Sequence, residues 1–554
     1  MKTNDFRITT SAGQLCTEKG VPLTNFSIRA VRLCCDQENQ SQILALQITV
    51  HHLNRDVNLL IDVHAGSLTG QILREIPTCK LLQASRSAAI DAYIIALGEK
   101  GAQISRPIYL YQHGLCRLGN GSWIYVAGDE VLGMPDGMEY EFSKALLRVH
   151  LAWDPTCSAT NAVNALCQRL ERIDGILMPI WAFTIFSSLR SSIAALNLTT
   201  LPTLAILGGQ NLGKTTLAQR YMLLYSDNNR PGRCVAQVDA HSTAAATIEQ
   251  VVKFRDQVVL IDDMAKSAAA SEEQARRNLI AELLRFASND VDRVKMSPSK
   301  RSETRFCQAG VAFTGEFWLH NPSDLSRMIV VEIQEQMHGG DPTERTVAAT
   351  VFRYLMLWLL PRLDEELKQL RQALDGVAEG DNIRLRKNRM VLLWALRVFY
   401  DFACDVGAVN KRYAAQAISR AGEVLDGLLD RQIREIERSK QKIPGGNLSW
   451  YVLTGYRKGL FHVVDRKDLR SNADCLVERD ALCICGDTLI WFFRKQTPYR
   501  SLTKKEMNRR LIEEGALSRG REERSAGKRI KGRRYLELSF SALEQAQRAY
   551  GLHI

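Results

Sequence analysis

The sequence predicts a mixed α/β fold in which a mostly parallel sheet is covered by helices on both faces. Five short apolar segments between residues 204 and 333 alternate with segments of helical periodicity. This alternation is typical of parallel strands joined by crossover helices. The first apolar segment runs into a glycine-rich loop, and the third ends in two aspartates. Two polar motifs are therefore expected on this sheet.

The composition indicates an ordinary globular protein of three or four domains, with 554 residues, 45% of them apolar and 24% charged. The net charge of +12 favours a polyanionic partner. The N-terminus lacks the apolar core of a signal peptide, and the apolar run at 176–189 is too short for a membrane span, so a buried helix is expected there. Thirteen scattered cysteines without a C-x-x-C pair indicate reduced thiols in a cytoplasmic protein rather than a zinc site.

Residues 1–145 predict an α+β domain. Alternating apolar residues at 26–33 and 43–50 indicate half-buried strands, and a helix is expected at 86–97. Residues 115–126 predict a hairpin with Asn120-Gly121 at its positive-φ turn. The four histidines of this region are spread too loosely for metal ligands. A scaffold or recognition domain of unknown ligand is the resulting hypothesis.

The loop at 208–216 matches the phosphate-binding pattern G-x-x-x-x-G-K-[ST], known as Walker A. An apolar strand at 204–207 precedes it and a helix is expected at 217–224, which is the setting that the mechanism requires. Backbone N–H groups would form an anion nest, Lys214 would reach the β- and γ-phosphates, and Thr215 would ligate magnesium. The alternative is a glycine-rich turn with an exposed lysine. The expected nucleotide-binding residues are Gly208, Gly209, Gln210, Asn211, Leu212, Gly213, Lys214, Thr215 and Thr216.

The segment 258–263, Val-Val-Leu-Ile-Asp-Asp, has the form of a Walker B strand. It follows a turn at 227–232, a second strand at 234–239 and a helix near 243–254. Asp262 is expected to hold magnesium, and Asp263 to polarise the attacking water. The alternative is a strand that simply ends in two solvated acids.

A basic hairpin is expected at 289–306, after a helix at 271–287. Its cations surround the break Ser-Pro-Ser at 297–299, and they are Arg293, Lys295, Lys300, Arg301 and Arg305. A solvated loop is the alternative.

The fourth and fifth strands are expected at 310–314 and 328–333. Thr314 closes the fourth strand and would sit beside Asp262, where it could orient the water. Arg327 opens the fifth strand, and an arginine there can stabilise phosphoryl-transfer charge on a nucleotide held by a neighbouring subunit. Alternatively, Arg327 caps the carbonyls at a helix C-terminus.

The C-terminal third begins with four helices, expected at 346–358, 364–374, 389–404 and 414–437, followed by a linker at Gly445-Gly446. A hairpin at 476–485 and a helix at 502–515 with Thr503 as its cap come next. Residues 504–534 hold twelve Lys/Arg against five Glu, a net charge of +7. A helix followed by a basic hairpin is the outline of a winged helix, used for nucleic-acid phosphates or for protein contacts. The residues expected to bind DNA here are Lys528, Arg529, Lys531, Arg533 and Arg534.

The order of these motifs resembles the primase-associated P-loop family of bacterial mobile elements. That family includes MCM-like replicative helicases of cassette elements and is akin to superfamily 3 helicases within the AAA+ class. The resemblance rests on Walker A, Walker B, the basic hairpin, Thr-Gly-Glu at 314–316 and the segment 326–333. Residues 113–133 are also similar to a hairpin ahead of the P-loop in this family. Many relatives end Walker B in Asp-Glu, whereas this chain has Asp-Asp, as superfamily 3 enzymes commonly do.

The resemblance implies a ring-forming ATPase, usually a hexamer, with ATP bound between subunits. It makes Thr314 sensor 1 and Arg327 the arginine finger in trans, and the hairpin at 293–301 points into a central pore. The implied domains are an N-terminal α+β domain (1–145), an AAA+-like P-loop ATPase core (146–340), a helical lid region (341–445) and a basic winged-helix-like region (446–554).

The sequence therefore predicts an ATP-driven DNA translocase, the replicative helicase of a mobile element. It would use ATP and Mg²⁺, grip single-stranded DNA in the pore of a homo-hexamer, contact duplex DNA through its C-terminal region, and need no membrane. An initiator or helicase loader that remodels DNA without unwinding is the main alternative. A small-molecule kinase leaves Arg327 and the basic segments without a role, and a non-hydrolysing regulator leaves Lys214 and Asp263 without one. No cluster of acids indicates primase activity.

Overall fold

The computed structural model forms two compact units, Met1–Ile433 and Arg434–Ile554, which are described separately. It describes residues 7–101, 106–144, 146, 148–171, 175–196, 201–240, 242–264, 270–288, 293–296, 302–319, 321–336, 343–380, 382–442, 448–471, 474–497, 499, 502–517, 528–530 and 533–549. The predictions for Lys300, Arg301, Lys531 and the linker Gly445-Gly446 lie outside these residues.

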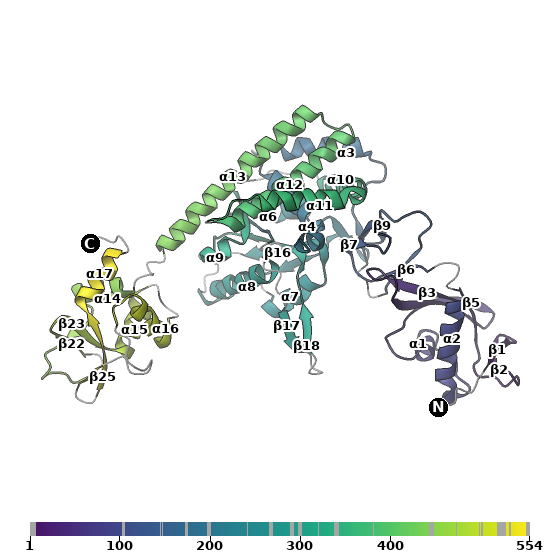
Figure 1. The fold of residues 1–554 in the computed structure, drawn as a ribbon, viewed down its shortest axis with the longest axis horizontal. Coiled ribbons are helices and arrows are strands. Elements are labelled where there is room, and N and C mark those ends of the chain that lie inside the picture. The colour runs from purple at the N-terminus through teal and green to yellow at the C-terminus, as the bar shows by residue number, and fades with distance from the viewer. Residues whose placement is uncertain are drawn as a thin grey trace. The chain divides into compact units, whose positions relative to one another are not determined.

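The N-terminal part of the first unit is a mixed sheet of strand order β10-β6-β3-β4-β5, covered by helices α1 and α2. Its core contains Leu46, Ile48, Ile90 and Ile94, all at most 1% exposed. An antiparallel ribbon formed by β1 and β2 lies beside the sheet (Figure 1). The elements are β1 (Ile8–Ser11), β2 (Gln14–Thr17), β3 (Ser27–Asp36), β4 (Ile43–His52), β5 (Arg55–Asp62), α1 (Leu68–Glu75), η1 (Ala84–Arg86), α2 (Ser87–Gly101), β6 (Ile108–Leu110) and β10 (Tyr140–Phe142).

An antiparallel meander links this sheet to the centre of the unit. It consists of β7 (Gly114–Arg117), β8 (Trp123–Ala127) and β9 (Glu130–Leu132). The predicted turn is present, but only Gly121 has a positive φ, +87°, while Asn120 instead accepts a hydrogen bond from the Ser122 backbone N–H at 3.0 Å.

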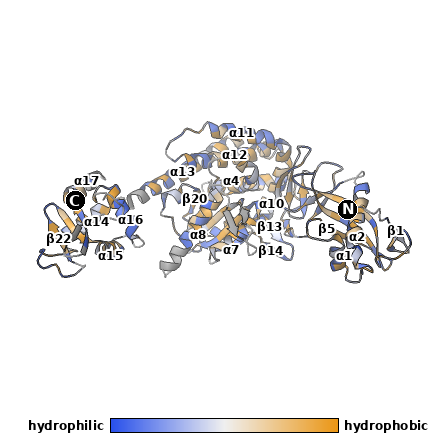
Figure 2. Cartoon of the chain, turned by 60° about the horizontal axis from the view of Figure 1, so that its bottom comes forward, coloured by the Kyte–Doolittle hydropathy of each residue, from blue (hydrophilic) through white to orange (hydrophobic). Residues whose placement is uncertain are grey.

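The central sheet has five parallel strands in the order β15-β16-β19-β12-β20. Strands β12 and β20 are mostly apolar, and β12 is buried from Thr203 to Leu207. Figure 2 shows this apolar character along the central strands, whereas both polar and apolar residues alternate along α11 and α12. The strands are β12 (Thr203–Gly208), β15 (Gln237–Asp239), β16 (Arg255–Met264), β19 (Gln308–Gly315) and β20 (Met328–Ile333).

Two boundaries around this sheet differ from the prediction. The P-loop helix α6 (Lys214–Tyr221) starts and ends earlier than expected, because the chain turns into β13 (Tyr225–Asp227). The single strand expected at 234–239 is two strands: β14 (Arg230–Cys234) pairs antiparallel with β13, and β15 joins the central sheet. Ala236, at φ +66°, makes the break between them. Strand β11 (Val149–Leu151) completes the small sheet β11-β13-β14.

Helices cover the central sheet. The most apolar of them, α4 (Leu177–Ser188), is buried at every residue, as predicted for 176–189. Among the described residues, no helix combines the length and apolar character needed to span a bilayer. The other helices around the sheet are α3 (Ala159–Leu170), α5 (Arg190–Ala194), α7 (Ala244–Val252), α8 (Ala270–Ser288) and α9 (Pro322–Leu325).

The predicted basic hairpin is present as β17 (Arg293–Met296) and β18 (Ser302–Arg305). In Figure 1 it projects from one side of the central sheet, and the later helices gather on the opposite side. These helices are α10 (Glu344–Leu359), η3 (Leu360–Arg362), α11 (Leu363–Asp375), α12 (Ile383–Asp405) and α13 (Lys411–Lys442). Helix α12 includes four basic residues in its first turns, Arg384, Arg386, Lys387 and Arg389.

A buried carboxylate joins the meander to the Walker B strand. Asp256, fully buried at φ +51°, accepts hydrogen bonds from the backbone N–H groups of Ser191 (2.7 Å) and Leu115 (3.0 Å). Gly114 packs so closely that an added Cβ would lie 2.7 Å from the Asp256 side chain. The meander is therefore anchored six residues before Asp262, on the same strand.

The second unit contains a sheet of order β21-β22-β23-β25-β24, and four helices lie wholly within its described residues. Thr503 caps α16 by accepting a hydrogen bond from the Glu506 N–H at 3.2 Å, as predicted. The elements are α14 (Leu448–Arg457), β21 (His462–Val463), β22 (Asp474–Glu478), β23 (Ala481–Cys485), α15 (Gly486–Gln496), α16 (Lys504–Glu513), β24 (Lys528–Ile530), β25 (Arg533–Ser539) and α17 (Phe540–Ala549).

Candidate nucleotide-binding site

The glycine-rich loop passes from the end of β12 to the start of α6, which is the strand–loop–helix arrangement predicted for it. Gly213 has φ +87° at the N-cap of α6, a conformation that favours glycine. Gly208 has no room for a side chain, because a Cβ there would lie 2.5 Å from the Ile333 carbonyl oxygen. The backbone of the loop is thus shaped by its glycines, with N–H groups at a helix N-terminus where anions bind.

Lys214, the first residue of α6, points back over the loop. Its Nζ donates hydrogen bonds to the carbonyl oxygens of Gly208 at 3.0 Å and Gly209 at 2.5 Å. Burial lowers the pKa of Lys214. Nearby carboxylates oppose that shift, and they belong to Glu316, Asp263 and Asp262. The Lys214 ammonium is therefore held over the loop, where it interacts electrostatically with these three carboxylates.

Asp262 lies at the centre of the site because β16 is separated from β12 only by β19. Its Oδ1 accepts hydrogen bonds from the hydroxyls of Thr215 at 2.7 Å and Thr314 at 2.5 Å. The placement of Thr314 beside Asp262 is the one that the strand order predicts. Three side chains from three separate elements thus meet at one carboxylate oxygen.

Asp263 has a distinct environment. The pairing of β16 with β19 shifts register between Ile261 and Met264, and Asp263 has φ +65° within that irregularity. Its backbone N–H donates to Thr314 Oγ1 at 3.1 Å, so one threonine hydroxyl fixes both aspartates. Within the described part of the chain, no hydrogen bond is made to the Asp263 carboxylate, and this group lines the cavity beside the loop.

Two glutamines complete the network, and sequence reasoning missed both. Gln237 on β15 donates from Nε2 to the second oxygen of Asp262, Oδ2, at 2.8 Å. Gln219 on α6 donates to Gln237 Oε1 at 3.0 Å. No short motif marks them, since their role depends on the pairing of β15 with β16. The sequence offered only a polar residue within the strand predicted before Walker B.

A cavity of about 450 Å³ lies beside the P-loop, and Lys214, Thr215 and Asp263 are among its lining residues. Glu316, just beyond the end of β19, also lines it and had no role in the prediction. The described residues around the cavity are Gln210, Asn211, Gly213, Lys214, Thr215, Thr216, Asp263, Thr314, Gly315 and Glu316. The cavity combines backbone donors and a lysine for anions with hydroxyl and carboxylate oxygens for a hard cation.

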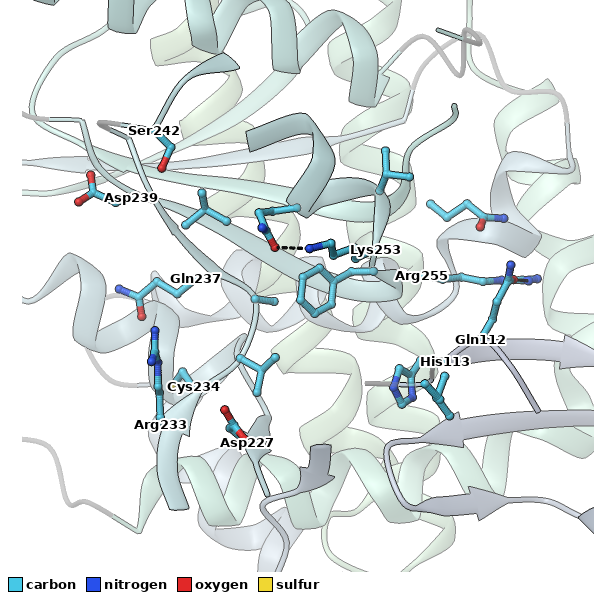
Figure 3. Close-up of a pocket in the computed structure, with 18 of the residues that line it drawn as sticks. Gln112, His113, Asp227, Arg233, Cys234, Gln237, Asp239, Ser242, Lys253 and Arg255 are labelled. Carbon is cyan, nitrogen blue, oxygen red and sulfur yellow. Dashed lines mark hydrogen bonds between the residues drawn. The ribbon is translucent and has the colours of Figure 1, made fainter. Parts of the chain in front are cut away.

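A larger cavity, of about 750 Å³, lies elsewhere in the first unit and is shown in Figure 3. His113, Arg233 and Lys253 are among its lining residues. Arg255 also lines it, and its Nη1 donates hydrogen bonds to Gln112 Oε1 at 2.6 Å and to Glu38 Oε1 at 2.5 Å. No P-loop residue lines this cavity, so the smaller cavity is the better candidate for phosphate chemistry.

Arg327 lies at the opposite edge of the sheet from the P-loop. β12 and β20 are parallel, with Thr203 opposite Met328, so the loop follows the far end of β12. Six strand residues separate the two edges by about 17 Å. The Arg327 guanidinium donates to Ser323 Oγ at 2.6 Å and to the Ser323 carbonyl, the helix-end contact given above as its alternative. Burial and the guanidinium of Arg384 lower the pKa of Arg327.

The described basic residues expected to bind DNA lie on two antiparallel hairpins, one in each unit. In the hairpin, Arg293 stands opposite Arg305 and Lys295 opposite Glu303. In the second unit, strand β24 with Lys528 and Arg529 pairs with β25, which includes Arg533 and Arg534, and Arg534 is exposed.

The net charge is divided very unequally between the two units. Residues 1–433 hold 47 Lys/Arg against 46 Asp/Glu, a net +1, and residues 434–554 hold 26 against 15, a net +11. The excess positive charge, from which the composition predicts a polyanionic partner, therefore lies almost entirely in the second unit.

Comparison with known proteins identifies the fold. No protein-family model matches the chain, and no curated protein matches it in sequence. A solved structure of the SCCmec type IV Cch protein, an active helicase, is 12% identical and covers 97% of this chain and 98% of its own, with a TM-score of 0.53. The JCV helicase bound to a small molecule is 13% identical over 49% of this chain and 70% of its own, but its TM-score of 0.21 is too low to carry an argument. The chain thus shares the fold of this solved helicase structure over almost its whole length.

Proposed function

We propose that this protein is an ATP-driven DNA translocase, the replicative helicase of a mobile genetic element. The observation that carries the proposal is the meeting of Thr215, Asp262 and Thr314 beside Lys214 at the carboxyl edge of a parallel sheet. The likeness of almost the whole chain to the fold of an active helicase supports it.

The residues present fit ATP and Mg²⁺. The Thr215 hydroxyl and the Asp262 carboxylate, 2.7 Å apart, are the oxygen ligands that magnesium prefers. Lys214 would exchange its two loop carbonyls for phosphate oxygens, and the N–H groups of 208–216 would hold the remaining phosphates. When bound, the metal would neutralise negative charge on the phosphates.

The two aspartates would divide the remaining work. Both oxygens of Asp262 accept hydrogen bonds, so this carboxylate is held in one orientation toward the metal position. Asp263 lines the cavity, and its carboxylate could accept a hydrogen bond from the attacking water. Thr314 would fix the positions of the two aspartates relative to each other and act as sensor 1. Gln237 would act as a positioning residue for Asp262.

The site would be shared between subunits. Arg327 lies at the far edge of the sheet from Lys214, so it cannot serve the nucleotide of its own subunit. We infer that it serves the neighbour's nucleotide in a ring, which we propose to be a hexamer. On binding, the guanidinium would leave Ser323 for the γ-phosphate.

DNA would be bound in two places. The hairpin with Arg293, Lys295, Lys300 and Arg301 would contact single-stranded DNA in the pore. The second unit would act as a winged helix on duplex DNA, with α16 and the β24–β25 hairpin as its binding elements and Lys528, Arg529, Lys531, Arg533 and Arg534 as its cations. The domain division at 145, 340 and 445 belongs to the same proposal.

Unwinding of a forked DNA tests the proposal. The wild type should separate the strands and hydrolyse ATP, and Lys214→Ala should reduce hydrolysis by about 100-fold or more, because a preorganised phosphate contact is lost. Lys253→Ala is the control, since this exposed lysine lies outside the P-loop cavity.

Two outcomes would contradict the proposal. Full hydrolysis by Lys214→Ala would exclude the P-loop as the catalytic site. Hydrolysis and DNA binding by the wild type without strand separation would favour the initiator or loader instead.

A further inference from the structure

One aromatic side chain of the second unit is exposed to solvent. Trp491, on helix α15, is 56% exposed, more than any other large aromatic residue described. All eight tryptophans lie in the described part of the chain. The other seven are buried or partly buried: Trp123, Trp153, Trp181, Trp318, Trp358, Trp394 and Trp450.

Three of the partly buried tryptophans have evident partners inside the protein. Trp123 donates to Asp364 at 3.0 Å, Trp358 donates to Asp405 at 2.9 Å, and the Arg353 guanidinium lies 4.0 Å above the Trp153 ring. Among the described residues, Trp491 has neither a hydrogen-bond partner nor a ring or cation neighbour of this kind. Exposing so much apolar area is unfavourable unless a partner covers it.

The charges around Trp491 indicate which partner. Arg494 and Lys495 follow one turn later on the same side of α15, and both are exposed. The one acid of helix α15, Asp487, lies one turn earlier and forms an ion pair with Lys504 at 2.8 Å. The Arg494 Nε donates to the Leu502 carbonyl at 2.9 Å, which orients that guanidinium.

We propose that Trp491 is a stacking platform for an unpaired nucleobase, with Arg494 and Lys495 holding the adjacent phosphates. Aromatic rings beside cations bind single-stranded nucleic acid regardless of sequence, because every base has a π-face. A base within a duplex is covered by its neighbours, so this surface is specific for single strands. The inference rests on the proposed DNA-binding function and adds a single-strand site to a unit otherwise assigned to duplex DNA.

Three variants of the full-length protein separate stacking from other contacts, by titration of a fluorescent oligothymidylate without ATP. Trp491→Ala should weaken binding by about 5- to 100-fold, as expected for loss of one base–aromatic stack. Trp491→Leu keeps apolar area without a π-face and should behave like alanine. Trp491→Phe keeps a ring and should stay within about threefold of the wild type. Binding of a blunt duplex should not change.

A local readout excludes an effect from elsewhere in the protein. Irradiation of bound 5-iodouracil oligonucleotide should crosslink it to the peptide containing Trp491, identified by mass spectrometry. Leu460→Ala is the matched control, because Leu460 is a 52% exposed apolar residue of the same unit, and it should bind like the wild type.

Each contrary result has a distinct meaning. Wild-type affinity in Trp491→Ala, with no crosslink to 486–496, would overturn the platform and leave the helicase proposal standing. Wild-type affinity in Trp491→Leu would also overturn it, and would indicate a protein partner for this apolar patch. Failure of the wild type to bind single strands at all would overturn the proposed function together with the platform.

Discussion

The two units differ in how their functional groups are held. The first unit is nearly neutral at +1, and its site is built on a hydrogen-bond network in which Thr215, Thr314 and Gln237 hold Asp262. The second unit carries +11, with exposed cations and an exposed tryptophan. Chemistry on a phosphate needs fixed geometry, whereas binding of a polyanion needs only a dense field of charge.

This difference gives the two units separable phenotypes. A change within the network of the first unit should alter hydrolysis and leave DNA affinity intact. A change on the surface of the second unit should do the reverse. A result that crosses this division would break the comparison.

The largest effect of this kind is expected at Thr314. Thr314→Val keeps the shape but removes the hydroxyl that bridges Asp262 and the Asp263 N–H. Loss of a preorganising hydrogen bond at a catalytic carboxylate should lower kcat by about 100-fold. DNA affinity without ATP should stay unchanged. Thr314→Ser, which retains the hydroxyl, should recover most of the activity. Equal activity in valine and serine variants would show that the bridge has no catalytic role.

A smaller effect is expected at Gln237. Gln237→Ala releases Asp262 Oδ2 but leaves both contacts to Oδ1, so kcat should fall by about fivefold, equivalent to one ordinary hydrogen bond. Because the carboxylate loses its fixed orientation, the Mg²⁺ concentration for half-maximal activity should rise, while KM for ATP changes little. Gln250→Ala, on the exposed face of α7, is the control. An unchanged magnesium dependence would make Gln237 merely structural.

The parts of the fold that sequence predicted well are those with local signals. The strand, loop and helix around Gly213, the buried helix α4 and the cap at Thr503 all follow from neighbouring residues. The position of Thr314 followed from the order of apolar segments, since parallel strands end at one edge. Short-range chemistry was therefore sufficient for these elements.

The parts that were missed depend on contacts between distant residues. Gln237 reaches Asp262 only because the backbone turns at Ala236, which ends β14 and places β15 beside β16. Asp256 anchors the meander through Leu115, which lies 141 residues earlier in the chain. Neither residue belongs to a motif, so no sequence pattern distinguished it from an ordinary strand residue.

The central proposal, that the nucleotide site is completed by a neighbouring subunit, rests on the placement of Lys214 and Arg327 at opposite edges of one sheet. Mixing two inactive variants tests it most directly. Lys214→Ala and Arg327→Ala should each abolish ATP hydrolysis alone. When they are co-assembled in equal amounts, about a quarter of the interfaces should pair an intact Lys214 with an intact Arg327, and hydrolysis should return. A mixture that assembles into rings but stays as inactive as its components would contradict the claim.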